Sequence, residues 1–344
     1  MSILPMSSTR NSHSAERNAA VLLVLALAVV LAALLSLRCG SQNYSVGEIV
    51  SAIVAHDESS TLWRIMAYAR LPRTVAALLA GAALALAGAI TQSVLNNSMA
   101  SPNVIGVNAG AGFFALLAAL VLPGVSGISA FASFVGALLT ALFIYALAVR
   151  AGLSRSSLIL AGLAVSSILT AGTNTITLLS PETVIGASGF LLGGFAGVTL
   201  ASIKGALGYV AAGAVIAALL AVDLNVLALG EESAAGLGLN VGRVRFVAIV
   251  AAALLAGGAV SFCGLLGFVG LLVPHMARRI MGTDNRWLFP ATALLGSAFV
   301  LSCDVLARVL FAPFEIPVGI ILAFLGGPFF LWLLLHGKRG RMYD

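Results

Sequence analysis

Long apolar stretches separated by short polar segments run through almost the whole chain. A helix that crosses a bilayer needs about 20 predominantly apolar residues, and such helices tolerate glycine and proline better than soluble ones. On this basis we predict about ten transmembrane helices. They lie at 19–37, 71–95, 104–122, 127–149, 157–179, 205–222, 244–263, 265–281, 287–307 and 317–336.

The same pattern divides the chain into an N-terminal tail (1–18), a transmembrane domain (19–336) and a C-terminal tail (337–344). An even number of spans places both tails on one side of the membrane. Of the 18 Lys and Arg residues, twelve fall on that side and six on the other, which predicts cytoplasmic tails. The longest cytoplasmic loop is then 223–243, and the segments 38–70 and 180–204 lie outside.

Composition sharpens the class of protein. Of the 344 residues, 60% are hydrophobic and 9% are charged, whereas soluble domains carry about 25% charged residues. This excludes a soluble enzyme, a nucleic-acid binder or a disordered chain, and indicates an all-α polytopic protein in a lipid bilayer. The net charge of +6 reflects basic cytoplasmic loops, so we expect no nucleic-acid partner.

Motifs for covalent chemistry are absent from the sequence. There is no GxxxxGK[ST] phosphate loop, no HExxH and no GxSxG. The cysteines Cys39, Cys263 and Cys303 are too widely spaced to indicate a metal site, so we expect no catalytic residue, metal or cofactor in this chain. Ion-coupled carriers keep ionisable groups deep in their spans, but here Asp304 is the exception in spans nearly free of acids. A transporter of this kind would take its energy from another subunit.

Four stretches carry a family resemblance. They are Ala69–Asn97, which continues as SPNVIGVNAGA, then Leu227–Arg245, Gly264–Pro290 and Asp304–Leu335. In this order they resemble the FecCD-like permeases, the membrane subunits of type II ABC importers for iron-siderophore complexes, haem and cobalamin. The resemblance implies the type II ABC importer permease fold, with ten spans and cytoplasmic termini, in the cytoplasmic membrane of a prokaryote.

The resemblance also implies the partners. Such permeases pair with a second permease, as a homodimer or a heterodimer, and with two ATP-binding-cassette ATPase subunits that bind ATP and Mg. An extracytoplasmic substrate-binding protein delivers the cargo. The chain is therefore expected to be a transport subunit and not an enzyme.

The cytoplasmic loop 223–243 contains a candidate coupling helix. Acids in a first turn favour a helix that begins near Glu231, and Gly236 or Gly238 could end it. The residues alone favour a solvated surface turn. The resemblance implies a helix that docks into a cleft on the ATPase, with Glu232 and Gly238 at the spacing of the coupling loop of ABC importers. The candidate set is Glu231, Glu232, Ser233, Ala234, Ala235, Gly236 and Gly238.

Three arginines lie at the predicted outer ends of spans. Arg70 and Arg73 flank Pro72, and Arg308 follows Asp304 by one helical turn. Interfacial arginines commonly extend toward water, and an i,i+4 Asp–Arg pair is a common local ion pair. The resemblance implies instead that Arg70, Arg73 and Arg308 receive acidic residues of the binding protein, because a guanidinium pairs with a carboxylate through two hydrogen bonds.

The resemblance implies a pathway between two permeases, lined largely by the fifth and tenth spans. The fifth span carries Ser166, Ser167, Thr170 and Asn174, whose spacing also suits helix packing. By position, the inner gate falls at Asn97 and Met99 in one turn and at Arg155 and Ser156 in another. The first turn departs from the family pattern Asn-Pro-Leu-Ala-Asp-Pro, because this chain has NSMASP at 97–102.

Cargo is the least determined property, because much of the selection lies on the binding protein. We expect a ferric siderophore, with haem and cobalamin as alternatives within the family. An ion-coupled secondary transporter is the rival from another class. A membrane-embedded enzyme is disfavoured because no pair of catalytic side chains converges in any predicted span.

Overall fold

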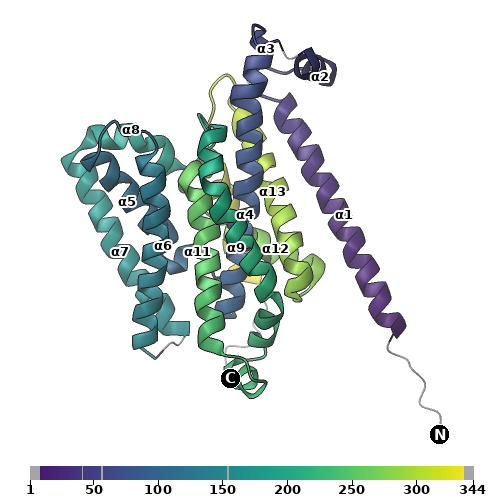
Figure 1. The fold of residues 1–344 in the computed structure, drawn as a ribbon, viewed down its shortest axis with the longest axis vertical. Coiled ribbons are helices and arrows are strands. Elements are labelled where there is room, and N and C mark those ends of the chain that lie inside the picture. The colour runs from purple at the N-terminus through teal and green to yellow at the C-terminus, as the bar shows by residue number, and fades with distance from the viewer. Residues whose placement is uncertain (1–7, 41, 56, 153–154, 337–344) are drawn as a thin grey trace.

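The computed structural model describes residues 8–40, 42–55, 57–152 and 155–336, which form helices and connecting turns without a strand in these ranges (Figure 1). A π-helical turn (Ile65–Arg70) joins α3 to α4, and a 3₁₀ turn (Pro102–Ile105) precedes α5. The α-helices are α1 (Ser8–Arg38), α2 (Val46–Ala55), α3 (Thr61–Arg64), α4 (Leu71–Leu95), α5 (Val107–Val121), α6 (Ile128–Arg150), α7 (Arg155–Leu179), α8 (Pro181–Leu192), α9 (Leu200–Leu227), α10 (Glu231–Gly236), α11 (Val241–Cys263), α12 (Val269–Met281), α13 (Asn285–Val309) and α14 (Val318–His336).

Each of the ten predicted ranges coincides largely with one helix, in order α1, α4, α5, α6, α7, α9, α11, α12, α13 and α14, although 104–122 and 265–281 begin before α5 and α12. Among the described residues, seven helical segments are long and apolar enough to cross a membrane. α5 and α14 are apolar but shorter, and α12 has only 13 residues. An all-helical, multi-pass membrane fold is therefore confirmed, while the count of ten spans stays a prediction.

The predicted boundaries differ from the helices at several polar ends. α1 already begins at Ser8, and α9 extends from Leu200 to Leu227 instead of 205–222. The loop predicted at 223–243 is therefore shorter and contains α10. On the other side, α3, the π-helical turn and α4 form one continuous helical segment, Thr61–Leu95. Hydropathy misses such extensions because helical hydrogen bonding continues past the point where side chains become polar.

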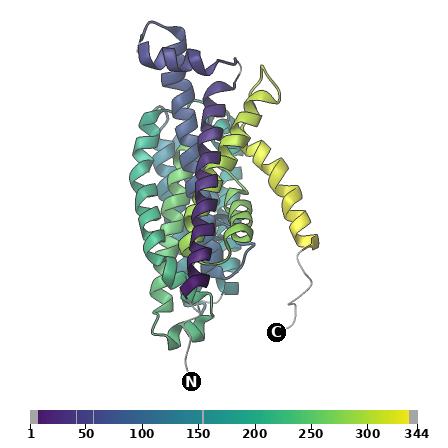
Figure 2. The same cartoon turned by 90° about the vertical axis from the view of Figure 1, so that its right-hand side faces the viewer.

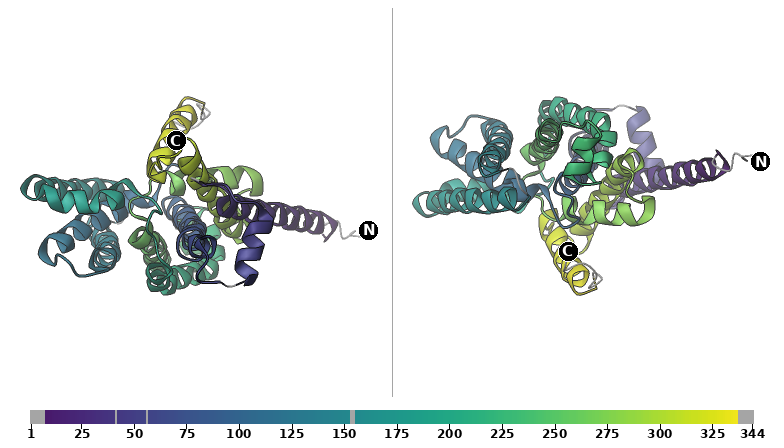
Figure 3. Two further views of the ribbon diagram at one scale, coloured as in Figure 1. Left: turned by 90° about the horizontal axis from the view of Figure 1, so that it is seen from above. Right: turned by 90° about the horizontal axis from the view of Figure 1, so that it is seen from below.

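α4 and α11 occupy the middle of the bundle (Figure 1). α5 to α8 form a layer on one side, and α1 lies on the other side against α13 (Figure 3). α14 leans away from the bundle (Figure 2). We call the end with α2 and α3 the α3 end, and the opposite end the α10 end. The start of α1 and the end of α14 both lie toward the α10 end (Figures 1 and 2).

Small residues bring the central helices into backbone contact. A Cβ added to Gly88 would lie 1.9 Å from the carbonyl oxygen of Gly270, and one added to Gly81 would lie 2.3 Å from that of Gly296. Lipid supplies little hydrophobic drive for helix association, so membrane helices depend on such close van der Waals packing. The buried faces of α4 and α11 are accordingly rich in alanine.

The α11–α12 connection is not helical. Residues 264–268 run as an irregular segment in which the amide of Leu265 donates to the carbonyl of Phe190 on α8 at 2.9 Å. The amide of Gly194 likewise donates to the carbonyl of Cys263 at 2.8 Å. Irregular backbone is tolerated at membrane depth only where protein groups satisfy it. This segment explains why the predicted span 265–281 becomes the short helix α12.

We predict that Gly88→Ala lowers the thermal unfolding midpoint of the detergent-solubilised chain. The new methyl group must push α4 away from α12, and overpacking of this kind destabilises by about 1–3 kcal/mol. Gly205→Ala on α9 is the matched control, because nothing lies within 4 Å of its added Cβ. That control should keep or raise the midpoint, since alanine is the better helix former. Equal midpoints for the two variants would contradict the packing argument.

Candidate functional site

The candidate coupling helix forms where the sequence places it. α10 begins at Glu231 after Gly230, which has a φ of +106°, and it ends at Gly236. Gly238, with a φ of +88°, donates its amide to the carbonyl of Ala235 at 2.9 Å. Ala234 is fully buried, whereas Glu232, Ser233, Ala235 and Gly236 are exposed. The helix is thus confirmed, and its small exposed side chains leave its outer surface accessible.

An ion pair holds α10 on α11. The Arg245 guanidinium lies 2.6 Å from the Glu231 carboxylate, and the exposed fraction of the two side chains is 5% and 46%. Asn240 caps α11 by accepting the amide of Arg243 at 3.0 Å, which positions the first turn that carries Arg245. Sequence reasoning missed this role of Arg245, although an arginine near the start of an otherwise apolar helix was an available signal.

At the α3 end, Arg73 lies between two acids. Its guanidinium contacts Asp304 at 3.0 Å and Glu315 at 2.6 Å, and Asp304 is completely buried. Arg308 contacts the same Asp304 at 3.2 Å, so the i,i+4 pair is present. Arg308 also donates to the carbonyl of Cys39 at 2.8 Å and to Ser36 Oγ at 2.9 Å. The cluster therefore ties α13 and α4 to the end of α1.

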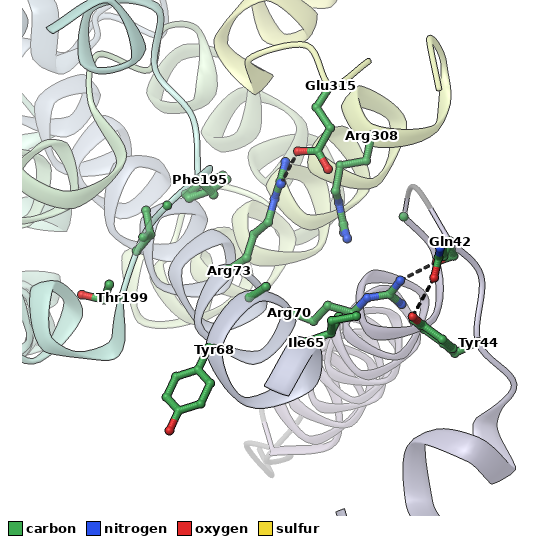
Figure 4. Close-up of a pocket in the computed structure, with 14 residues that line it drawn as sticks. Gln42, Tyr44, Ile65, Tyr68, Arg70, Arg73, Phe195, Thr199, Arg308 and Glu315 are labelled. Carbon is green, nitrogen blue, oxygen red and sulfur yellow. Dashed lines mark hydrogen bonds and ion pairs between the residues drawn. The ribbon is translucent and has the colours of Figure 1, made fainter. Parts of the chain in front are cut away.

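Arg70 belongs to the same end but bonds to backbone carbonyls instead of to an acid. Its guanidinium donates to the carbonyls of Leu37, Arg38 and Gln42, and it lies 4.6 Å from the centre of the Tyr44 ring. Together with Arg73, Arg308 and Glu315, it lines a pocket of about 420 Å³ (Figure 4).

The structure thus gives the three arginines a role that sequence reasoning missed. The exposed fraction is 7% for Arg70 and 3% for Arg308, and both guanidinium groups are occupied by groups of this chain. Arg73 is the most accessible of the three, at 13% of its side chain. Docking of a binding protein by these residues stays a prediction. Their burial arises because the loop after α1 folds back over them, which no spacing in the sequence indicates.

One face of α7 carries exposed polar side chains. Ser167, Thr170 and Asn174 are exposed, and Ser167 satisfies its hydroxyl within the helix by donating to the carbonyl of Leu163 at 2.9 Å. Ser166 lies partly buried, and its Oγ has no hydrogen-bond partner among the described residues. The opposite side packs closely, since a Cβ on Gly162 would lie 1.9 Å from the carbonyl oxygen of Val104. The structure brings these four residues onto one helix without assigning them to a pore.

The turn after α4 contains the first candidate gate residues. Asn96 adopts a left-handed conformation that ends α4, and the Asn97 side chain accepts the amide of Met99 at 2.9 Å. Asn97 and Met99 are exposed at the α10 end, as is Ser156 at the start of α7. The Arg155 side chain lies outside the described residues. The 3₁₀ turn at Pro102–Ile105 packs on α7, so the two candidate gate segments are connected through protein contacts.

Within the described ranges, no three His, Cys, Asp or Glu side chains gather as a metal site would require.

Comparison with known proteins decides the family. The model of the FecCD transport family matches residues 27–336. The chain belongs to the FecCD transport family. Within the family, it is 35% identical over 331 residues to the Fe(3+)-citrate import system permease protein YfmE of Bacillus subtilis, covering 96% of this chain and 99% of that one. It is 36% identical to the ferric enterobactin transport system permease protein FepD of Escherichia coli, over 92% of this chain and 95% of the relative.

Other relatives of this FecCD-family chain carry different names. The cobalamin import system permease protein BtuC of Halobacterium salinarum is 40% identical, over 77% of this chain and 72% of the relative. A solved metal-chelate type ABC transporter in an inward-facing conformation matches with a TM-score of 0.80 at 28% identity, covering 92% of this chain and 98% of that one. The family model, which matches residues 27–336, extends from within α1 to the end of α14.

We predict that Asp304→Asn destabilises the FecCD-family chain by about 3–5 kcal/mol, because it leaves two buried arginines without their shared carboxylate. Asp57→Asn is the matched control, since Asp57 is an exposed loop residue that bonds only to nearby groups. Thermal unfolding in detergent measures both variants. An Asp304→Asn midpoint equal to that of the control would show that the cluster is not needed for stability.

Proposed function

We propose that this chain is the permease subunit of an ABC importer that moves an iron complex across the cytoplasmic membrane of a prokaryote. The observation that carries the proposal is the FecCD family match over residues 27–336, with relatives named as import permeases that align along nearly their whole length. The proposed cargo is a ferric siderophore. Haem and cobalamin remain the alternatives, because relatives of similar identity are named for them.

The proposed topology has ten spans and both termini in the cytoplasm. Two observations support it. The start of α1 and the end of α14 lie toward the same end of the bundle as α10 (Figure 2). That end also carries the larger share of Lys and Arg in the predicted topology. The α3 end then faces the substrate-binding protein, and the α10 end faces two ATPase subunits that hold ATP and Mg.

The proposed coupling element is α10. Its exposed surface is built from Ser233, Ala235 and Gly236, which allow close approach of another protein. Ala234 and the Glu231–Arg245 ion pair hold it against the bundle, so a force applied to α10 reaches α9 and α11. In this proposal, nucleotide-driven movement of the ATPases displaces α10 and opens or closes the gate at Asn97–Met99 and Arg155–Ser156.

The proposed pathway runs between this chain and a second permease, identical or different. The exposed polar face of α7 supports this placement. Polar side chains directed at lipid find no polar groups to bind, whereas beside a pathway they face water or cargo. α14 also presents an open face, with Phe324 75% exposed. Arg70, Arg73 and Arg308 are retained as proposed docking residues at the α3 end, with Arg73 and the pocket beside it as the accessible part.

The ion-coupled alternative finds little support in the described charges. Asp304 is the acid buried within the bundle, and it contacts both Arg73 and Arg308. With both carboxylate oxygens bonded to arginines of the same chain, Asp304 is poorly placed to bind a coupling ion.

The test of the proposed function is reconstitution into liposomes with the cognate ATPase and binding protein. We expect uptake of radioactive iron-siderophore only with ATP on the ATPase side, and none with a non-hydrolysable analogue. Haem and cobalamin, each offered with the same binding protein, decide among the alternative cargoes. Uptake driven by an ion gradient without ATP would overturn the proposal.

A second prediction concerns the pathway. Thr170→Trp should strongly lower the uptake rate while ATP hydrolysis continues, because the indole would project from the polar face of α7. Ile168→Trp is the control: Ile168 is 71% exposed but lines an apolar groove between α7 and α5–α6. If both variants transport equally well, α7 does not line the pathway.

A further inference from the structure

Polar side chains connect the ends of three helices at the α10 end. Asn225, in the last turn of α9, donates from Nδ2 to Asp284 Oδ1 at 2.7 Å. Its Oδ1 accepts the backbone amide of Asn285 at 2.9 Å. Both sides of one amide group therefore bind the first residues of α13. These two hydrogen bonds hold the end of α9 in one position relative to α13, because an amide offers a donor and an acceptor in a fixed geometry.

The contacts continue from α13 to α4. Asn285 is 3% exposed, and its Oδ1 accepts Ser93 Oγ at 3.3 Å. Ser93 lies in the last turn of α4, directly before the turn that holds Asn97 and Met99. The amide of Asn97 donates back to the carbonyl of Gln92, the residue next to Ser93, at 3.0 Å. The last link of this chain of hydrogen bonds therefore lies at the candidate gate.

Neighbouring groups fix the middle of this series of hydrogen bonds. Asp284 caps α13 by accepting the amide of Arg286 at 3.1 Å, and the Arg286 side chain, which lies 2.9 Å away, holds the pKa of Asp284 below its ordinary value. Gln92, which is 1% exposed, accepts the Arg278 guanidinium of α12 at 3.1 Å. The start of α13 and the end of α4 are therefore each bonded to their neighbours, so that a displacement of one is passed on to the other.

The other end of this series of hydrogen bonds, at Asn225 on α9, leads to α10. Only residues 228–230 separate α9 from α10, and their amides donate to carbonyls of the last turn of α9 at 3.1–3.2 Å. A connection this short and this bonded transmits displacement, whereas a slack loop would absorb it. Coupling between distant sites is carried by such contiguous packed and hydrogen-bonded elements.

We propose that Asn225, Asn285 and Ser93 are positioning residues that form a relay from α10 to the turn at Asn96–Met99. When α10 moves, the end of α9 moves with it, and the two asparagines pass that displacement to Ser93 and the end of α4. The relay rests on the proposed function, because it takes α10 as the contact with the ATPase and the Asn97 turn as an inner gate.

The test compares two serines in the reconstituted importer. Ser93 and Ser302 both donate to the carbonyl four residues earlier, at 3.0 and 2.8 Å, and Ser302 is exposed on α13. Ser93 differs from Ser302 because its hydroxyl also donates to Asn285 on α13. We expect Ser93→Ala to lower the cargo moved per ATP hydrolysed at least about fivefold, the low end of typical coupling between sites. Ser302→Ala should match the wild type, and Ser93→Thr should restore the ratio because it returns the hydroxyl.

A second measurement reports on the gate directly. Hydrogen exchange of the 96–100 amides should change between the nucleotide-free and the vanadate-trapped complex in the wild type and in Ser302→Ala. In Ser93→Ala and Asn225→Leu this change should be lost, while both variants still bind the ATPase. A wild-type nucleotide response in Ser93→Ala, together with a wild-type transport ratio, would overturn the relay and leave the proposed function standing. Failure of the wild type to transport with ATP would instead overturn the proposed function.

Discussion

The contact of α4 with α12 and α13 is the constraint on which the rest of the structure depends. Gly81 faces Gly296 and Gly88 faces Gly270 so closely that no side chain fits between the backbones. In a bilayer the hydrophobic effect does not drive helices together, so this close approach supplies dispersion contacts that larger side chains would prevent. α4 is therefore held along its length, and its two ends carry the two groups of polar side chains described above.

Buried polar groups find their partners in different ways at the two ends. At the α3 end, full charges are buried, so Asp304 is shared by Arg73 and Arg308, and remaining donors reach backbone carbonyls after α1. At the α10 end, the end of α4 is instead joined to its neighbours by hydrogen bonds of uncharged side chains, Ser93 to Asn285 on α13 and Gln92 to Arg278 on α12. A paired buried charge is expensive to separate, whereas amide and hydroxyl contacts can be exchanged at low cost. The α3 end is thus suited to a fixed joint and the α10 end to movement.

Hydropathy predicted much of the fold, and the sequence also predicted part of the candidate site. Each of the ten predicted ranges coincides largely with one helix. α10 begins at Glu231 because acids favour a helix start and glycines favour its end. The four stretches that resemble FecCD-like permeases led to the family that the family match confirms. The short α12 and the irregular 264–268 segment were not predicted, since apolar composition alone does not separate helix from buried irregular backbone.

The sequence by itself determined that the chain is a multi-pass helical membrane protein of the FecCD family, because lipid requires long apolar helices and the motifs lie in a fixed order. Only the tertiary structure decided what the polar residues do. Sequence spacing indicated only the Asp304 partner of Arg308, whereas the end of α1 and the loop after it cover both Arg70 and Arg308 and accept hydrogen bonds from them. No sequence pattern indicated the contacts of Arg245, Asn225 and Asn285, whose partners lie 14 to 192 residues away along the chain. Such contacts depend on which helix ends meet in space, and hydropathy carries no information about that.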